Sequence, residues 1–333
     1  MATVSVIIIF LDAVDYLREA VDSVREQSFS DWELILVDDG SSDGSSALAR
    51  RLSSEDPGRI RYLDHPGHAN LGMSASRNAG VDAARGRYVA FLDSDDRYLP
   101  SRLASHVAIL EQTPHVSAVQ GCLWYWKSWA GAPDEAEIPP LGTYEGVTPP
   151  TGLLDLLLRT RGGTAPGICS LTIRREVYLR LGGCEPAFTG LFEDQVLWSK
   201  LYLSQAVYVT GEPTSLYRQR ADSSTGKAGE QGLIEARLAY LEWLEGYLEG
   251  LPVVSRTTRA LLRASIGEYR SPMSAAVKGF PEKLLAPLRQ VGLASLPAPL
   301  AQRTVLIWRN YKSRRHQRRL RGARKASGLP AHD

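Results

Sequence analysis

The stretch YVAFLDSDDRYLP, residues 88–100, decides the fold, because an apolar run ends there in acid. Three carboxylates, Asp93, Asp95 and Asp96, follow the apolar residues within four positions. Aspartate is a poor strand residue, and neighbouring like charges repel each other. A solvated turn would explain the pattern, since Asp and Ser favour turns. A cation or a phosphate-bearing ligand at the carboxyl end of a buried strand would explain it as well.

The first hundred residues alternate between strand and helix patterns. Continuous apolar runs predict buried strands, and apolar residues spaced three or four apart predict helices. Strands of this kind, separated by helices, form a parallel sheet with both faces covered. The predicted strands are 4–10, 32–39, 60–65 and 88–93, and the predicted helices are 16–27, the segment capped by Ser42 or Asp43, 73–84 and 101–112.

The second half of the chain is less regular. Gly and Pro residues make 130–152 a predicted loop. A turn-rich lead at 182–203 runs into a predicted helix, and leucines recur at helical spacing from about residue 232 onward. Further strands are predicted at 168–175, 206–210 and 215–220.

Two of the early strands end in acid. Asp38 and Asp39 follow one of them, and Asp93, Asp95 and Asp96 follow the other. In open α/β sheets, ligands bind in the crevice beyond the carboxyl ends of the strands. We therefore expect these five carboxylates, far apart in sequence, to gather around one crevice.

The bulk composition is that of an ordinary globular protein, with 44% apolar and 23% charged residues among 333. This length suits one large domain or two smaller ones. Three dispersed cysteines without a CxxC spacing indicate a reducing compartment. No apolar run reaches about 18 residues, so no transmembrane helix is predicted. The apolar start lacks a preceding basic residue and predicts a first strand rather than a signal peptide.

The charge is unevenly distributed. The segment 303–325 holds ten Lys or Arg and no acid, which leaves 29 basic against 37 acidic residues elsewhere, a net charge of −8. An anionic bilayer surface would attract such a tail, and aromatic residues in its lead-in suit that role. A nucleic acid would attract it too, and a solvated terminus is the plain alternative. We favour the membrane and regard nucleic acid as an unlikely partner.

Several segments, taken in order, resemble the family 2 glycosyltransferases, an inverting group with the GT-A fold. The resemblance covers about residues 3–225. It implies an α/β fold whose central, mostly parallel sheet is flanked by helices, with a GT-A domain at 1–225, a helical region at 226–302 and a basic tail at 303–333. The segments are VSVIII, YLREAVDSVREQSFSDWELILVDDGSSDGS, NLGMSASRNAGVDAARGRYVAFLDSDD, GGCEPAFTGLFEDQVLWSKL and LYRQRADSST.

The resemblance implies a nucleotide-sugar donor. Its diphosphate would be repelled by the carboxylates unless a divalent cation, Mg²⁺ or Mn²⁺, lay between them. Asp95 matches the metal ligand of the family, and Asp93 matches the residue near the ribose and the donor sugar. Asp96 has two possible roles: it lies near the metal without binding it, or it caps the helix that starts near Pro100.

The nucleotide base is assigned to the ends of the first two strands. Asp38 matches the position that accepts a hydrogen bond from the base, which fits uracil and therefore a UDP-sugar, and also fits thymine. Asp39 assists or orients the turn. Phe10 and Asp12 belong to the turn that flanks the base, together with Leu11. The family commonly has Pro-x-Tyr/Phe-Asn there, and this chain departs from that pattern with Phe-Leu-Asp-Ala at residues 10–13.

Three arginines of this chain stand at positions that the family pattern associates with this site. Arg77, with Asn78, either supports the donor site or is a surface arginine on a packed helix. Arg218 matches a residue that contacts the diphosphate. Arg220 stands where the family has His, and arginine can serve only a phosphate, because it is always charged and cannot ligate a cation.

Glu193 and Asp194 match the family's Glu-Asp motif. Asp194 matches the catalytic base that takes the acceptor hydroxyl's proton as that oxygen attacks the anomeric carbon. Glu193 positions the acceptor or the loop. The plain alternative is an acidic first helical turn, which the helix dipole favours.

The acceptor, a carbohydrate or a glycolipid, is not identified by any motif. Trp124, Trp126 and Trp129 form a sugar-stacking wall or belong to the core. The implied location is cytoplasmic, on the membrane's inner face. A nucleotidyltransferase is a rival, but the first strand lacks the Gly-rich loop it needs, and no GxGxxG supports a dehydrogenase. A non-catalytic polyanion binder acting through its tail is a second rival.

Overall fold

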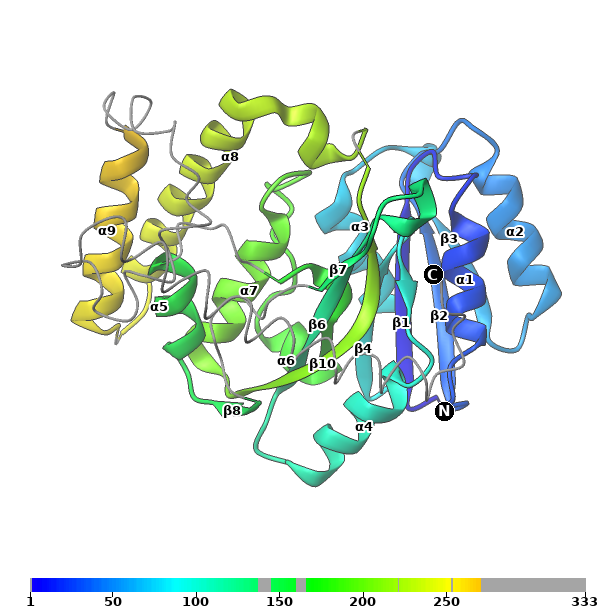
Figure 1. The fold of residues 1–333 in the computed structure, drawn as a ribbon, viewed down its shortest axis with the longest axis horizontal. Helices are drawn as coiled ribbons and strands as arrows, with labels where there is room; N and C mark the ends of the chain where they lie inside the picture. The colour runs from blue at the N-terminus through cyan, green and yellow to red at the C-terminus, as the bar shows by residue number, and fades with distance from the viewer. Residues whose placement is uncertain (1, 137–144, 160–165, 221, 253, 271–333) are drawn as a thin grey trace. The chain divides into compact units, whose positions relative to one another are not determined.

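The structure, a computed structural model, describes residues 2–136, 145–159, 166–220, 222–252 and 254–270 (Figure 1). The chain divides into two compact units, Met1–Gly267 and Glu268–Asp333, and the predicted site residues all lie in the first. The predicted basic tail at 303–333 and the segment 271–302 lie outside the described residues. The division of the chain at residues 225 and 302 stays a prediction.

Over residues 2–112 the strands and helices lie close to those that the sequence predicts. Farther along, the strand Ala118–Trp126 and the helices Gly152–Arg159 and Arg175–Arg180 were not predicted, and the predicted loop 130–152 contains the short strands Glu135–Ala136 and Gly146–Thr148. The strands are β1 Val4–Phe10, β2 Trp32–Asp38, β3 Ile60–Asp64, β4 Tyr88–Asp93, β5 Arg97–Tyr98, β6 Ala118–Trp126, β7 Glu135–Ala136, β8 Gly146–Thr148, β9 Leu171–Arg174 and β10 Val207–Arg218. The α-helices are α1 Leu17–Arg25, α2 Ser45–Glu55, α3 Met73–Ala83, α4 Arg102–Gln112, α5 Gly152–Arg159, α6 Arg175–Arg180, α7 Glu193–Ser204, α8 Ser224–Glu249 and α9 Arg256–Arg270. Short 3₁₀ turns are η1 Pro66–His68, η2 Ser128–Ala130 and η3 Ile168–Ser170.

The strands form one sheet in the order β3-β2-β1-β4-β9-β6-β10-β5, with β7 beside β6 and β8 beside β10. Strands β3, β2, β1 and β4 run parallel, as predicted. Beyond them the sheet is mixed, because β9 runs antiparallel to both β4 and β6. Apolar runs do not reveal strand direction, so this part of the sheet could not be predicted. The two strands predicted at 206–220 are one bulged strand, β10.

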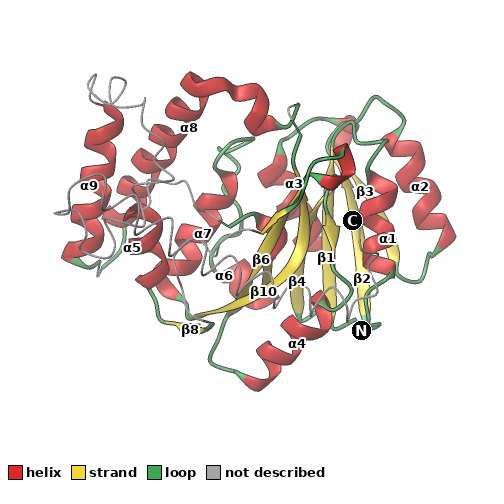
Figure 2. Ribbon diagram, viewed as in Figure 1, coloured by secondary structure: helices red, strands yellow, loops and turns green. Residues whose placement is uncertain are grey.

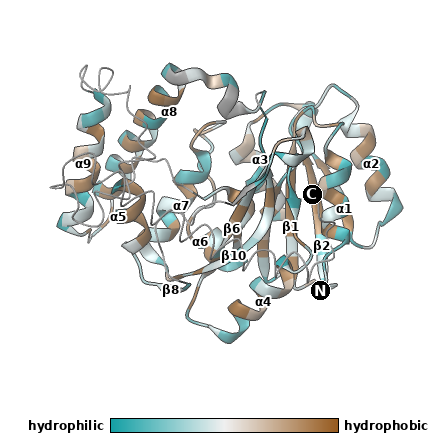
Figure 3. Ribbon diagram, in the orientation of Figure 1, coloured by the Kyte–Doolittle hydropathy of each residue, from teal (hydrophilic) through white to brown (hydrophobic). Residues whose placement is uncertain are grey.

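Helices lie on both faces of the sheet (Figure 2). Because successive side chains of a strand point to opposite faces, those of β1 alternate between these two layers. Val6 and Ile8 belong to the apolar core that contains residues of α1, α2 and α4. Ile7 points to the opposite face, where a Cβ on Gly80 of α3 would lie 2.5 Å from Ile7 Cγ2. Helix α3 therefore packs directly on β1 because position 80 has no side chain. In Figure 3 the central strands are mostly coloured as apolar, as expected for strands covered on both faces.

The register of the parallel strands sets the location of the acids. Phe10 lies opposite Asp38 of β2, and Ile9 lies opposite Asp93 of β4. The carboxyl ends of β2 and β4 therefore meet the same edge of the sheet, on either side of β1. Two strand spacings separate them, which is about 10 Å.

The C-terminal helices of this unit are attached by polar contacts between buried side chains. Ser199 of α7 and Tyr240 of α8 share a hydrogen bond of 2.7 Å between their hydroxyls. Thr258 of α9 donates to Asp155 of α5 at 2.6 Å. The predicted helical pattern from residue 232 is thus confirmed as far as Arg270. Among the described residues, none of the helices combines the length and apolarity that a membrane span requires.

The loop that precedes β4 packs closely against β1. A substitution at Gly86 tests this packing. A Cβ on this buried glycine would lie 2.6 Å from the backbone nitrogen of Ser5, which cannot move without disturbing β1. We expect Gly86→Ala to lower the free energy of unfolding by about 1–3 kcal/mol, measured by urea denaturation. Gly58→Ala is the control, because a Cβ on Gly58 would have no heavy atom within 4 Å, and this change should stay within about 0.5 kcal/mol. Equal losses in both variants would contradict this packing.

Candidate active site

A buried arginine joins the acid at the end of β4 to the acidic start of α7. Arg77 of α3 donates from Nη2 to Asp93 Oδ1 at 3.0 Å and from Nη1 to Glu193 Oε1 at 2.5 Å. Only 2% of Arg77 is exposed, so it is not a surface arginine. Two acids that lie 100 residues apart in sequence, Asp93 and Glu193, are thus held together by one guanidinium.

Asp194 lies next to this bridge, in the first turn of α7. Burial and the charge of Glu193 raise the pKa of Asp194 well above its ordinary value, while Arg77 opposes the shift. Burial also raises the pKa of Glu193 itself, again against the effect of Arg77. A carboxylate whose pKa is raised is a stronger base than an exposed aspartate. The predicted base therefore has an environment suited to accepting a proton.

The residue before the Glu-Asp pair has an unusual backbone. Phe192 has φ +65°, in the left-handed region that non-glycine residues rarely adopt. Its ring stacks on Tyr240 of α8, with centroids 6.1 Å apart and planes 15° apart. Arg237, also in α8, lies with its guanidinium carbon 5.6 Å from the Phe192 ring and donates to Gln195 of α7. Helix α8 therefore supports the turn that presents Glu193 and Asp194.

Helix α3 holds the segment that leads into this turn. Ser74 donates to the carbonyl of Phe188 at 2.6 Å. Asn78 donates to the carbonyl of Cys184 and accepts from its N–H, both at 2.9 Å. A Cβ on Gly72 would lie 2.7 Å from Thr189 Cβ, so the two backbones approach closely. The Ser-Ala-Ser-Arg-Asn sequence thus connects the carboxyl edge of the parallel strands to the Glu-Asp segment. In it, Asn78 forms hydrogen bonds with the backbone of Cys184.

The other two acids after β4 contact the end of β10. Arg220 pairs with Asp95 Oδ2 through Nε at 3.0 Å and Nη2 at 2.9 Å. Asp96 accepts the backbone N–H of Arg218 at 2.8 Å. Asp96 therefore does not cap α4, whose flanking residue is Ser101. The capping alternative for Asp96 is wrong because its carboxylate is used by β10.

Negative charge accumulates at this strand end. Burial and the charge of Asp93 raise the pKa of Asp95, although Arg220 opposes this. Burial and both neighbouring carboxylates raise the pKa of Asp96 well above its ordinary value. A cation would relieve this repulsion, and carboxylate oxygens are preferred by Mg²⁺ and Mn²⁺. The Sγ of Cys169 lies within 4.8 Å of oxygens of Asp93 and Asp96, but burial raises the pKa of its thiol, and a neutral thiol is a poor ligand.

Arg218 is surrounded by aromatic rings and acids that the sequence did not connect with it. It donates from Nε to the carbonyl of Asp95 at 2.7 Å and from Nη2 to Glu19 of α1. Its guanidinium carbon lies 4.0 Å from the centroid of Trp126 and 5.1 Å from that of Trp129. Glu19 was missed because an acid on an exposed helix face carries no sequence signal.

The three tryptophans of the predicted sugar-stacking wall lie outside the buried core. Trp124 and Trp126 are half-buried, and Trp129 is 38% exposed. Trp126 and Trp129 pack on Arg218 instead of filling the interior. The alternative of a core position is therefore wrong, and the role of these rings in sugar stacking stays a prediction.

The two acids at the end of β2 accept hydrogen bonds from internal donors. Asp38 is fully buried and accepts from the N–H of Ser41 at 2.9 Å, from the Tyr62 hydroxyl at 2.9 Å and from the Ser46 hydroxyl. Asp39, 4% exposed, accepts the N–H groups of Leu71 at 2.8 Å and of Gly72 at 3.1 Å. Both acids fix turns at the ligand edge. The contact of Asp38 with a nucleotide base stays a prediction.

Reciprocal hydrogen bonds join the turns after β1 and β2. Asp12, with φ +48°, accepts the N–H of Ser42 at 2.7 Å, and its own N–H donates to Ser41 Oγ at 3.1 Å. Asp43 accepts the N–H of Val14 at 3.0 Å. Gly44, rather than Ser42 or Asp43, is the N-cap residue of α2, and Asp43 Oδ1 accepts the N–H of Ser45 at the start of that helix at 2.9 Å.

The side chain of Phe10 does not face the ligand edge. It is 2% exposed and belongs to the apolar core, while its carbonyl accepts the N–H of Asp39 at 2.9 Å. Leu11, by contrast, is 45% exposed. A contact with a nucleotide at this turn would therefore involve backbone of Phe10 and side chains of Leu11 or Asp12.

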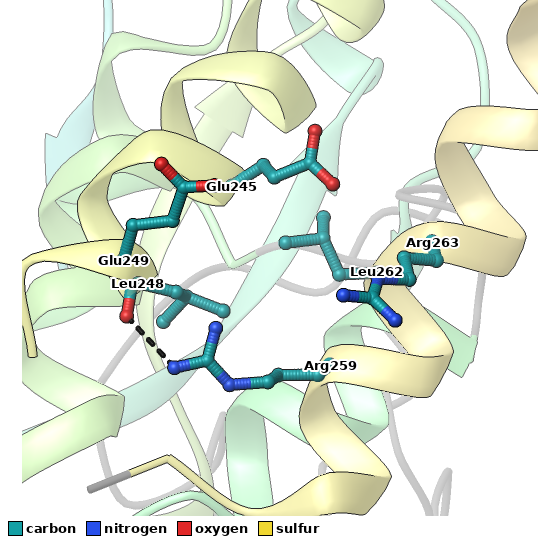
Figure 4. A pocket seen from close by; sticks show the side chains of 6 residues that line it. All are labelled: Glu245, Leu248, Glu249, Arg259, Leu262 and Arg263. Carbon is teal, nitrogen blue, oxygen red and sulfur yellow. Dashed lines mark hydrogen bonds between the residues drawn. The ribbon is translucent and has the colours of Figure 1, made fainter.

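A pocket between α8 and α9 is lined by residues other than the predicted site residues (Figure 4). Arg259 donates there to the carbonyl of Leu248 at 3.1 Å. None of the predicted site residues lines the pocket, whose walls are Glu245, Leu248, Glu249, Arg259, Leu262 and Arg263. The acids after β2 and β4 therefore remain the candidate site.

Known proteins share both the sequence pattern and the fold. The sequence model of Glycosyl transferase family 2 matches residues 5–170. The uncharacterized glycosyltransferase EpsJ of Bacillus subtilis is 36% identical over 125 residues, which are 38% of this chain and 35% of EpsJ. The uncharacterized glycosyltransferase YibD of Escherichia coli is 38% identical over 97 residues, 29% of this chain and 27% of YibD. The matched segments thus span about a third of these curated relatives, and the family resemblance concerns the N-terminal half.

Solved structures extend the likeness in fold. S. aureus TarS 1–349, in complex with UDP-GlcNAc, superposes with a TM-score of 0.60 at 18% identity, over 86% of this chain and 79% of that one. The mannosyltransferase PcManGT from Pyrobaculum calidifontis, in complex with GDP-Man and Mn²⁺, gives 0.55 at 16% identity, over 92% and 87%. The mixed sheet flanked by helices is thus the GT-A fold of glycosyltransferases. The chain belongs to glycosyl transferase family 2.

The bridge made by Arg77 can be tested by removing its charge. Arg77→Gln leaves the buried Glu193 and the half-buried Asp93 without their cation, so we expect a loss of about 3–5 kcal/mol in the free energy of unfolding at neutral pH. Without Arg77 the pKa of Glu193 rises further above its unfolded value. Protonation then favours the folded state, and the deficit should shrink as pH falls from about 8 to about 5.

Urea denaturation of wild type and variant across this pH range measures the effect. Arg51→Gln is the control, because Arg51 is 65% exposed and its pair with Glu55 spans 3.9 Å. This change should cost at most about 1 kcal/mol and should show no such pH dependence. A deficit for Arg77→Gln that is small, or constant with pH, would contradict the bridge.

Proposed function

We propose that the protein is an inverting glycosyltransferase that moves a sugar from a nucleoside-diphosphate donor, a UDP-sugar, to an acceptor hydroxyl. The observation that carries this proposal is the Arg77 bridge, because it holds Asp93 at the donor edge beside the Glu193-Asp194 pair. Complexes of fold neighbours support a nucleotide-sugar at this edge: TarS was solved with UDP-GlcNAc and PcManGT with GDP-Man. Uracil is preferred on the sequence match of Asp38.

The chemistry assigns one role to each group. The acceptor oxygen attacks the anomeric carbon from the face opposite the diphosphate, and its proton passes to the carboxylate of Asp194. The bond between the anomeric carbon and the phosphate oxygen breaks, and the nucleoside diphosphate leaves with the electron pair. Configuration at the anomeric carbon is thereby inverted. Glu193 and Arg77 hold Asp194 in place, and Asp93 faces the ribose and the donor sugar.

A divalent cation fits the acids after β4. Asp95, with Asp93 beside it, would hold Mg²⁺ or Mn²⁺, and such an ion offsets the charge that builds on the departing diphosphate. The Mn²⁺ in the PcManGT complex supports this choice of ion class. Arg218 contributes a further positive charge at the same strand end.

The acceptor and the location are proposed from the family and from the charge distribution of the sequence. A carbohydrate or glycolipid acceptor follows from the family, and the exposed ring of Trp129 offers a surface on which a sugar could stack. Association with the cytoplasmic face of a membrane rests on the basic segment 303–325 alone, which lies outside the described residues.

A donor screen tests the function. The full chain is incubated with a panel of sugar nucleotides and simple sugar acceptors, with Mn²⁺ or with EDTA, and release of nucleoside diphosphate is measured. We expect release from one UDP-sugar, and Asp194→Asn should lower kcat by about 10²–10⁴-fold. Glu176→Gln, an exposed acid on α6, should leave the rate unchanged. Wild-type turnover by Asp194→Asn would overturn the assignment of the base.

The pH profile tests how Asp194 is tuned. The base must be deprotonated, so activity is lost as pH falls through its pKa, and the raised pKa places this acid limb above the ordinary value of an aspartate. Glu193→Gln removes a charge that raises this pKa, while Gln can still accept from Arg77. We expect the limb to move to lower pH in Glu193→Gln, measured as kcat against pH. A limb that stays in place, or moves upward, would contradict the role of Glu193.

A further inference from the structure

The predicted metal ligand already has a cationic partner within this chain. Two nitrogens of the Arg220 guanidinium, Nε and Nη2, lie 3.0 and 2.9 Å from the same oxygen of Asp95, Oδ2. The side chains of both residues are only 19% exposed. A charge-assisted pair with this geometry and burial is stronger than an ordinary surface ion pair.

Arg220 is also held from its other side. Its Nη1 lies 3.3 Å from Asp222 Oδ2, and its guanidinium carbon lies 4.6 Å from the centroid of the Tyr16 ring. These contacts fix the plane of the guanidinium beside Asp95. The same strand end carries Arg218, which uses the carbonyl of Asp95 and not its carboxylate. Arg220 is therefore the arginine whose described contacts neutralise the Asp95 carboxylate directly.

A guanidinium and a divalent cation compete for this carboxylate. Both carry positive charge, and two cations on one carboxylate repel each other strongly at low solvent exposure. Arginine cannot lose its proton to make room, nor can it become a ligand. A diphosphate changes the balance, because its oxygens match the fork of a guanidinium and its negative charges attract both cations.

We propose that Arg220 occupies Asp95 in the donor-free protein and transfers to the diphosphate when the donor binds, so that the metal binds together with the donor and not before it. Arg220 is in this view a positioning residue that makes metal and nucleotide binding strongly interdependent. The inference rests on the proposed function, since the diphosphate belongs to the donor. It also gives a physical meaning to the arginine at position 220, where the family has a histidine.

The test separates metal binding from nucleotide binding and needs no turnover. Binding of Mn²⁺ to the full chain, without nucleotide, is measured by the loss of the free-ion EPR signal. Binding of UDP in EDTA is measured by calorimetry. In Arg220→Gln we expect Mn²⁺ to bind at least about tenfold more tightly and UDP in EDTA to bind at least about tenfold more weakly, within the range usual for coupled ligands.

Arg97→Gln is the matched control. Arg97 is at the same strand end, is 26% exposed and pairs with Glu19 and Glu26, not with Asp95. It should leave both affinities unchanged. Thermal unfolding of each variant, followed by circular dichroism, verifies that the fold is intact. Because Arg220→Lys keeps the charge but loses the fork, it should keep Mn²⁺ binding weak while still weakening UDP.

The outcomes are distinguishable. Unchanged Mn²⁺ affinity in a folded Arg220→Gln overturns the competition at Asp95, and unchanged UDP affinity in EDTA overturns the transfer to the diphosphate. A wild-type protein that binds no UDP, and releases no nucleoside diphosphate in the donor screen, contradicts the proposed function instead. The Mn²⁺ measurement uses the metal alone and remains decisive for Arg220 in that case.

Discussion

The guanidinium of Arg77 is the interaction on which the site depends. Carboxylates at the end of β4 and at the start of α7 repel each other, and burial makes the repulsion expensive. Arg77 contacts Asp93 and Glu193 at once, so that acids from distant segments can share one buried edge. Its position follows from α3 packing tightly on β1, which the missing side chain of Gly80 permits. Fold and charge arrangement are thus coupled through a single helix.

The charges at this edge form an alternating arrangement of acids and arginines. Asp93 pairs with Arg77, Asp95 with Arg220, and Asp96 with the backbone of Arg218. Such an arrangement keeps a strongly acidic edge folded while no ligand is bound. It also means that a polyanionic ligand meets arginines as well as acids. Binding of a diphosphate would then exchange ion pairs within the protein for ion pairs with the ligand.

Much of this could be predicted from the sequence, and the missing parts have physical reasons. The apolar runs at β1, β2 and β4 were sufficient to place strands, and the acids after them were sufficient to place a ligand edge. Strand direction was not available, so a strand was predicted at 168–175 but its antiparallel pairing in the sheet was not. Side-chain partners were not available either. Nothing in the sequence shows that Asp38 accepts hydrogen bonds from Ser41, Ser46 and Tyr62, or that Glu19 contacts Arg218. Long-range hydrogen bonds depend on packing, which a local pattern does not encode.

The stacking of Phe192 on Tyr240 has a consequence for shortened versions of the chain. A left-handed backbone at Phe192 is unfavourable for a residue with a side chain, and the ring of Tyr240 in α8 is part of what stabilises it. Cutting the chain at the end of the region that resembles the family would remove this support. The turn carrying Glu193 and Asp194 would then relax toward an ordinary backbone, and both carboxylates would change direction. The smallest fragment that preserves the geometry of the acid pair therefore extends through Tyr240.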